Sequence, residues 1–190
     1  MMDAQMIHQI LAHRMHAVAL LNWALALRTN WEAAPSIGVY IDGKLTLDGN
    51  LNALTNPMIE AGLVNCRALI EFLGLNCNKH GSLGQIIRRK SGDVGVEDFQ
   101  NADGHLKKVD PKVALSRYGG DPSEAERALL SILHLTNKGI AHTTMDLNKD
   151  PEHGRLIEIA SRGVPSLMIS YFYTPLGLHP PDTKISTYTR

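Results

Sequence analysis

The residues best suited to chemistry form a short polar cluster, Asn137, Lys138 and His142, near the end of residues 121–144. On a continuing helix, residues four apart share a face, so His134, Lys138 and His142 would form one strip. A cation beside an imidazole favours the neutral imidazole, which can act as a base near neutral pH. Such a pair suits metal-free cleavage of RNA. The imidazole would take the 2′-hydroxyl proton or protonate the leaving oxygen, while the cation offsets charge on the phosphate.

The same residues also fit a purely structural role at the end of a helix. Asn and Lys side chains near a helix C-terminus satisfy the last carbonyl groups and interact favourably with the helix dipole. Gly139 is suited to ending the helix that precedes it. The sequence therefore leaves two interpretations of Asn137 and Lys138 open, a catalytic cluster and a capped helix end.

The helix that precedes the cluster must position it. Asp121 or Ser123 is suited to capping its start, and the spacing of Ser123 and Glu126 is typical of a capping box. This pattern predicts one helix that packs on its apolar side and carries the cluster at its far end. The residues that predict the buried stripe are Ala125, Leu129, Leu130, Leu133 and Ile140.

A second helix supplies an arginine. Asn56 and Pro57 predict its start, with Asn56 as the cap and Pro57 at the first helical position. Arg67 and Glu71 lie four residues apart on this helix and can pair along its surface. Two placements of Arg67 stay open, a solvated surface pair and a side chain that points into a groove against another helix. The residues that predict its apolar face are Ile59, Leu63, Cys66, Ile70 and Leu73.

The N-terminal third predicts a long helix followed by a hairpin. Apolar residues recur at steps of three and four through residues 2–29, which is typical of one buried helix face. The most apolar run, between Arg14 and Arg28, is too short for a bilayer, which needs ~20 apolar residues, so we expect no membrane partner. An Asp-Gly pair at 42–43 between two alternating runs predicts a β-hairpin over residues 36–48.

Residues 76–120 form the least regular region of the chain, with short helices predicted at 85–90 and 111–118. Long irregular segments inside a compact domain are usually functional or mobile. A basic triplet in this region is a candidate RNA-binding patch, although most charge runs are solvated faces. The triplet comprises Arg88, Arg89 and Lys90.

Residues 151–173 predict the last helix, with Asp150 as its cap and a kink or split at Pro165. The tail that follows is rich in proline and is expected to be extended. The pattern therefore predicts a single helical domain over residues 1–174 and an extended C-terminal tail over residues 175–190.

We expect neither a metal nor a cofactor. Residues 146–157 resemble the first half of a calcium loop, but Pro151 stands where that loop needs Gly and Ile157 where it needs a bidentate Glu. His13 and His16 lie one helical turn apart and could share a metal. No third ligand is spaced to complete that site, which a structural zinc ion would need.

Composition sets broader limits. The 190 residues suit one domain, and an aromatic fraction of 5% favours helix packing over a sheet sandwich. Nineteen basic and nineteen acidic residues balance, so no net charge steers the chain toward nucleic acid or acidic membranes. Cys66 and Cys77 are the only cysteines, which indicates a reduced, cytoplasmic setting.

Two segments, CRALIEFL and LTNKGIAHTT, together resemble the HEPN superfamily of higher eukaryotes and prokaryotes nucleotide-binding domains. The likeness is greatest to its uncharacterised bacterial branches and its abortive-infection-related branches. In those proteins one helix carries an Arg followed four residues later by an acidic residue and Phe, and a later helix ends in a polar residue, a basic residue and an Ala-His step. The matched residues are Arg67, Glu71, Phe72, Asn137, Lys138, Ala141 and His142.

The resemblance implies a mainly α fold, an up-and-down helical bundle that here carries the small inserted hairpin. It also implies a homodimer with the His-bearing helices at a shared cleft. Active members are metal-independent ribonucleases, which here implies a toxin or phage-defence role and an antitoxin or other protein partner. The catalytic candidates are therefore His142, Lys138, Asn137 and Arg67.

The sequence departs from the active pattern in one place. In active members four to six residues separate an Arg from the His, whereas the ten residues before His142 contain no Arg and Lys138 stands only four positions before it. Lys keeps the charge but lacks the bidentate fork that Arg offers a phosphate. A non-catalytic dimeric helical module that binds a protein or nucleotide partner is therefore the alternative.

Overall fold

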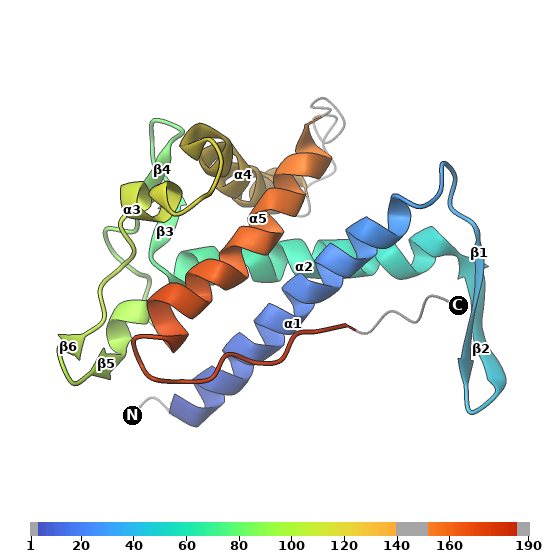
Figure 1. Ribbon diagram of the computed structural model, residues 1–190, viewed down its shortest axis with the longest axis horizontal. Helices are drawn as coiled ribbons and strands as arrows, with labels where there is room; N and C mark the ends of the chain where they lie inside the picture. The colour runs from blue at the N-terminus through green and yellow to red at the C-terminus, as the bar shows by residue number, and fades with distance from the viewer. Residues whose placement is uncertain (1–3, 140–151, 186–190) are drawn as a thin grey trace.

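The computed structural model describes residues 4–139 and 152–185 and shows a mainly helical protein with small antiparallel hairpins (Figure 1). The α-helices are α1 (Ala4–Arg28), α2 (Leu51–Phe72), α3 (Pro111–Ser116), α4 (Pro122–His134) and α5 (His153–Met168). Single π-helical segments, η2 (Leu135–Gly139) and η4 (Ile169–Tyr173), follow α4 and α5. The paired strands are β1 (Ser36–Ile41) with β2 (Lys44–Asn50), β3 (Leu75–Cys77) with β4 (Leu83–Gln85), and β5 (Gln100–Asn101) with β6 (Gly104–His105).

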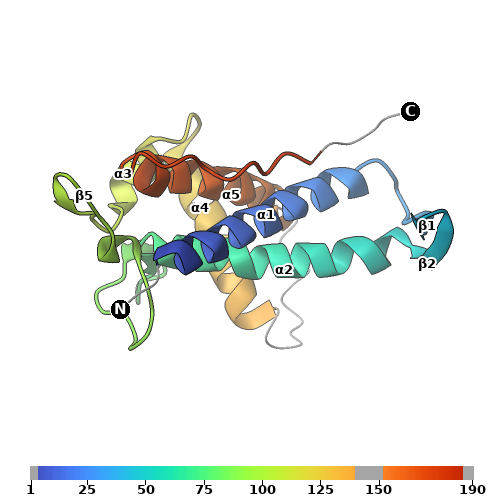
Figure 2. The ribbon, with the colours of Figure 1, turned by 90° about the horizontal axis from the view of Figure 1, so that it is seen from below.

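Helices α1 and α2 form the framework of the fold. They lie side by side in both ribbon views and are joined at one end by the β1–β2 hairpin, so they run in opposite directions (Figures 1 and 2). The two helices approach closely at Gly62, where an added Cβ would lie 2.4 Å from the Leu21 Cβ and 3.0 Å from the Ala17 carbonyl oxygen. Glycine at this position therefore allows the two backbones to pack closely.

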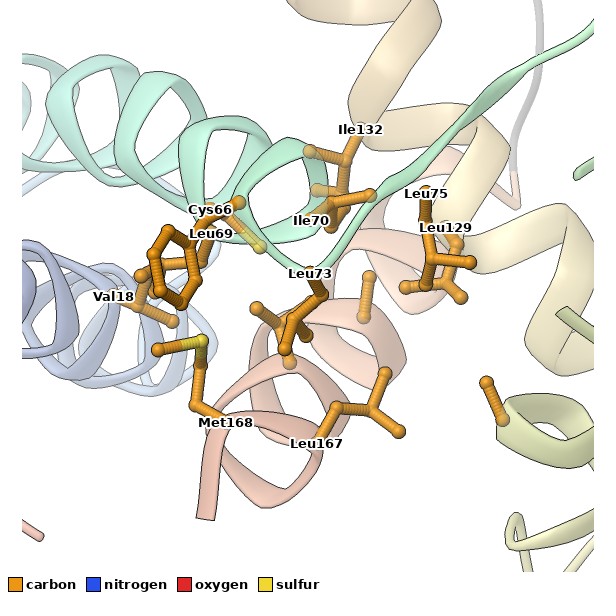
Figure 3. Packing of buried hydrophobic residues seen from close by; sticks show 14 of the residues in the cluster. Val18, Cys66, Leu69, Ile70, Leu73, Leu75, Leu129, Ile132, Leu167 and Met168 are labelled. Atoms are coloured by element: carbon orange, nitrogen blue, oxygen red, sulfur yellow. The ribbon is translucent and has the colours of Figure 1, made fainter. Parts of the chain in front are cut away.

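Helices α4 and α5 cover this framework. Figure 2 shows α4 running across α2 rather than along it, and α5 packs against both α1 and α4. The core lies where these four helices meet, and Figure 3 shows Ile70 of α2 against Ile132 of α4. All three phenylalanines of the chain, Phe72, Phe99 and Phe172, pack edge to face within this core.

The predicted N-terminal helix is confirmed as α1, with Leu11, Met15, Val18 and Leu21 buried in the core. Although the run between its arginines is short, the helix over Gln5–Arg28 is long and apolar enough to cross a membrane by length and composition alone. The expectation of a segment too short to cross a bilayer therefore holds only for the run between Arg14 and Arg28, and not for the whole helix. One side of this helix is buried against α2 and α5, whereas Met6, Ile10 and Leu20 are exposed.

The predicted β-hairpin is also confirmed. Asp42 and Gly43 both have positive φ, 48° and 76°, as a tight hairpin turn between twisted strands requires. The second strand runs on to Asn50 rather than ending at the predicted limit of residue 48. The hairpin stands away from the core, and most of its side chains are exposed (Figure 1).

The predicted start of the second helix at Asn56 and Pro57 is wrong. Helix α2 begins at Leu51, and its cap is Asn50, whose side chain accepts a hydrogen bond from the Ala53 amide. Asn50 also ends strand β2, so hairpin and helix follow one another without a loop. Pro57 lies inside the helix, where an Asn-Pro pair gives the same sequence signal as a true cap.

Two other local predictions are corrected by long-range contacts. Residues 85–90 form no helix, because β4 pairs with β3 and the Ile86 amide bonds to the Gly74 carbonyl at 2.7 Å. The capping box at the start of α4 does not form, since Asp121 accepts from the Ser123 amide and Glu126 accepts from the Leu83 amide at 2.8 Å. The short helix predicted over residues 111–118 is confirmed as α3.

The last helix contains Pro165 within α5 and changes to the wider π-helical segment η4 after Met168. A split at Pro165 is not found, because α5 continues through the proline to Met168, and a kink there stays a prediction. Its predicted cap, Asp150, lies outside the described residues. Beyond Gly177 the described tail has no regular structure and runs beside α1 in both views (Figures 1 and 2), where the Asp182 carbonyl lies 2.8 Å from the His16 Nε2.

Candidate functional site

The candidate site centres on Arg67, which connects α2 to the segment that follows α4. Its Nε donates to the Glu71 Oε1 at 2.8 Å, and its Nη1 donates to the Asn137 Oδ1. The Arg67 side chain is 29% exposed, and Asn137 is exposed on η2. Arg67 thus combines the two placements that the sequence left open. It pairs with Glu71 along its own helix, and it also contacts a second helical segment through Asn137.

Packing between α2 and α4 places these two residues opposite each other. The buried side of α4, including Leu129, Ile132 and Leu133, faces the core against α2 (Figure 3). Thr136 is buried at the start of η2, and its hydroxyl donates to the Ile132 carbonyl at 2.7 Å. A hydroxyl bonded back to the carbonyl four residues earlier often bends a helix, and this bond lies where α4 changes to the π-helical turn that carries Asn137.

The geometry of η2 corrects the predicted strip of residues four apart. The α-helix ends at His134, and residues 135–139 form a π-helical turn, which is wider than an α-turn. The four-residue spacing that would align His134 with Lys138 therefore no longer applies. π-Helical turns inside helices occur frequently at functional sites, and here the turn carries Asn137.

The remaining two catalytic candidates are placed differently. The backbone of Lys138 belongs to η2, directly after Asn137, but its side chain is outside the described part of the chain. His142 lies outside the described residues altogether. The structure thus brings together Arg67 and Asn137 and leaves the roles of Lys138 and His142 as predictions.

Arg67 retains capacity to bind an anion. Two of its three guanidinium nitrogens are held by Glu71 and Asn137, which fixes the plane of the group. Within residues 4–139 and 152–185, Nη2 has no hydrogen-bond partner. A fixed guanidinium with a free edge can donate to a phosphate oxygen, a charge-assisted hydrogen bond that is stronger than a neutral one.

The basic triplet at 88–90 does not form one patch. Arg89 is only 13% exposed and makes four hydrogen bonds, two to Glu97 and two to the carbonyls of Glu71 and Phe72 at the end of α2. Arg89 therefore caps α2 and is not presented to RNA. Arg88 and Lys90 are exposed, and their RNA contact remains a prediction.

The same network shifts the acidity of Glu97. Partial burial alone would raise the pKa of this carboxyl, but hydrogen bonds and the charges of Arg89 and Lys108 outweigh burial and hold the pKa below its ordinary value. Lys108 Nζ lies 3.4 Å from the Glu97 Oε1 and also donates to the Ile86 carbonyl at 2.7 Å. The network ties the irregular segment to the end of α2, on which Arg67 stands.

Sequence reasoning missed a thiol–imidazole pair next to the candidate site. Cys77 Sγ lies 3.5 Å from the His134 Nε2 and 3.5 Å from the Asn78 carbonyl oxygen. His134 ends α4, three residues before Asn137. The two partners are separated by 57 positions, and no local pattern indicates such a contact.

His16, one of the two histidines considered for a metal, has other neighbours. His16 Nδ1 lies 2.8 Å from the Ala12 carbonyl oxygen, and its Nε2 faces the Asp182 carbonyl oxygen. Among the residues described, no three His, Cys, Asp or Glu side chains are grouped as metal ligands.

Comparison with known proteins found no matching family model, no matching curated protein and no matching solved structure. The functional argument therefore rests on the chain's own residues and on the likeness of its two motifs to the HEPN superfamily.

Proposed function

We propose that this protein is a HEPN-like, metal-independent endoribonuclease whose site is formed by Arg67, Asn137, Lys138 and His142. The observation that supports this most is the hydrogen bond from Arg67 to Asn137. These residues lie in two motifs that each resemble the HEPN pattern, and they come from helices far apart in sequence. An ion pair on the surface of α2 without a function would need only Glu71 beside Arg67, and would not need a contact with Asn137.

In the proposed reaction, His142 takes the proton of an RNA 2′-hydroxyl or protonates the leaving oxygen, and water takes or supplies the proton at the other oxygen. The 2′-oxygen attacks phosphorus and the bond to the 5′-oxygen breaks, which leaves a cyclic phosphate and a 5′-hydroxyl. Arg67 and Lys138 offset the negative charge that builds on the phosphate oxygens, and Asn137 orients the guanidinium. Such preorganised donors need no metal ion in the step described.

Arg67 is placed to replace the arginine that active HEPN members carry before their histidine and that this chain lacks before His142. Lys138 occupies the place of the basic residue in the later motif but is a point charge without a fork. Arg67 supplies a planar guanidinium from the opposite helix, held in place by Glu71. We infer that the two cations divide the work of the single arginine in active relatives.

The proposal also covers the oligomeric state and the cellular role of the protein. An up-and-down HEPN bundle would dimerise with its His-bearing helices at a shared cleft, and the two active sites would face the same RNA. As a cytoplasmic toxin or phage-defence enzyme it would be held inactive by an antitoxin or another protein. Light scattering of the purified chain measures the dimer, which has twice the mass of the chain.

The direct test is cleavage of a long RNA in excess chelator by wild type and by His142→Ala. Loss of a general acid–base residue lowers the rate by roughly 100- to 10,000-fold. Wild-type cleavage that persists in chelator and disappears in the variant supports the proposal. Equal rates in both proteins, or no cleavage by either, rule it out.

A second candidate function is a non-catalytic dimeric module that binds a protein or nucleotide partner. It is favoured by the exposed apolar side chains of the β1–β2 hairpin, where Tyr40 is 65%, Ile41 58% and Leu45 52% exposed. Exposed apolar groups of this kind are typical of protein contact surfaces. Replacing Tyr40 and Leu45 by Ser would weaken dimerisation or partner binding in this case and leave any RNA cleavage unchanged.

A further inference from the structure

A hollow of about 500 Å³ lies between α3, α4 and α5. Its walls are mostly apolar and include Leu115 of α3, Ala125 and Ala128 of α4, and Ala160, Gly163 and Leu167 of α5. The volume falls in the ~300–1,000 Å³ range of pockets that bind small molecules. The hollow borders the N-terminal half of α4, whereas Asn137 follows the C-terminal end of that helix. It is therefore separate from the candidate ribonuclease site.

Small side chains keep this space open. Four small residues border the hollow, Ala125 and Ala128 on α4 and Ala160 and Gly163 on α5, beside larger ones such as Leu129 and Leu167. A Cβ built on Gly163 would meet no atom within 4 Å, so the glycine faces open space. Protein interiors normally fill such volumes, because unfilled space forfeits packing contacts.

One cation at the edge of the hollow is without an acidic partner. Arg117 is exposed, and its guanidinium lies 4.8 Å from the centre of the Tyr171 ring. Within residues 4–139 and 152–185 no carboxylate pairs with it. The nearby charges are matched instead, since Glu124 accepts from the Tyr118 hydroxyl at 2.7 Å and forms an ion pair with Arg155.

We propose that this hollow binds a small amphiphilic carboxylate, with its hydrocarbon part among the helices and its carboxylate on Arg117. The apolar walls select a hydrocarbon body, and burying it supplies most of the affinity. The single unpaired guanidinium selects an anionic head, since planar Arg and carboxylate pair through two parallel hydrogen bonds. Stacking on Tyr171 holds the guanidinium at the mouth of the hollow.

The test is calorimetric titration of the full chain with decanoate and with 1-decanol, which share a hydrocarbon tail and differ in the charged head. Decanoate is expected to bind at least ten-fold more tightly than decanol, because a charge-assisted hydrogen bond contributes enough for that factor. Arg117→Gln should weaken decanoate roughly ten-fold and leave decanol unchanged. The matched control is Arg162→Gln, since Arg162 lies on α5, is 69% exposed and does not line the hollow.

Filling the hollow is the second arm of the test. Gly163→Leu should abolish binding of decanoate while the melting temperature stays at or above that of wild type, because the new side chain enters open space. Gly154→Leu is the matched control, since Gly154 lies in the same helix, is exposed and also has no neighbour within 4 Å. Should Gly163→Leu fail to fold, Gly163→Ala tests the same space with one methyl group.

Three results would overturn the proposal. One is the absence of decanoate binding to wild type. The others are equal affinity for decanoate and decanol, and undiminished binding by Gly163→Leu. Retained RNA cleavage in all these variants would show that the hollow acts independently of the ribonuclease site.

Discussion

Arg67 on α2 donates a hydrogen bond to Asn137, which lies 70 positions later on the π-helical turn after α4. Glu71, one turn further along α2, holds the same guanidinium through its Nε. The arginine is therefore fixed between its own helix and a second one. The hydrogen bond therefore brings one residue of the α2 motif into contact with one residue of the η2 motif.

Replacing Arg67 tests whether the fixed guanidinium matters for RNA. Arg67→Ala should lower the rate of RNA cleavage by roughly 100-fold, as expected for loss of a donor to transition-state charge. Arg67→Lys should recover only a small part, because Lys cannot hold Glu71 and Asn137 and still present a donor to phosphate. Cleavage assays in chelator give the rates. The melting temperature is the control, which shows whether Arg67→Ala still folds after losing its partly exposed ion pair. Full activity of Arg67→Ala would contradict the assignment.

The Glu97 network predicts a pH-dependent contribution to stability. Because the folded protein holds the pKa of Glu97 below its ordinary value, the ionised carboxylate stabilises the fold above the unfolded pKa of ~4.3. That contribution is lost as pH falls through the lowered folded pKa. Glu97→Gln should therefore melt at a lower temperature than wild type at pH 7, and the difference should shrink below about pH 4. A difference that is constant from pH 7 to pH 3 would contradict this account.

Gly62 predicts a packing defect at the α1–α2 contact. A methyl group there would overlap Leu21, so Gly62→Ala should lower the free energy of unfolding by about 1–3 kcal/mol. Gly163→Ala is the matched control, because its methyl group meets no atom within 4 Å and alanine is favoured by up to ~1 kcal/mol in a helix. Urea denaturation measures both. Equal stability of the two variants would show that the helices do not approach at Gly62.

The two cysteines should differ in reactivity. Burial of Cys66 raises the pKa of its thiol, whereas Cys77 is only partly buried and faces His134. Iodoacetamide should therefore modify Cys77 first in the folded chain, because the thiolate is the reactive form and Cys66 is buried with a raised pKa. Mass spectrometry of timed samples identifies the site. Equal reaction rates of Cys66 and Cys77 in the folded protein, as expected in denaturant, would contradict the prediction.

Helix identity and the hairpin turn could be predicted because their signals are local. The spacing of Leu11, Met15 and Val18 predicts α1, and the Asp-Gly pair at 42–43 predicts the turn between β1 and β2. Helix starts were less predictable. Asn50 and Asn56 are both suited to be caps, and the structure uses the one that ends the hairpin.

The candidate site could be predicted only in part, because its decisive contacts are long-range. The pairing of Arg67 with Glu71 follows from four-residue spacing, but the contact with Asn137 depends on how α4 crosses α2. Arg89 looked like part of a basic patch because its neighbours are basic. Its role appears only when the end of α2 and Glu97 are placed around it.

The central claim is that Arg67 and Asn137 act together in RNA cleavage, and a double-mutant cycle tests it most directly. Single-turnover cleavage rates in chelator are measured for wild type, Arg67→Ala, Asn137→Ala and the double variant. We predict that each single change slows cleavage and that the double variant is little slower than Arg67→Ala alone, because the two side chains form one unit. Losses that multiply, or cleavage unaffected by either change, would contradict the account.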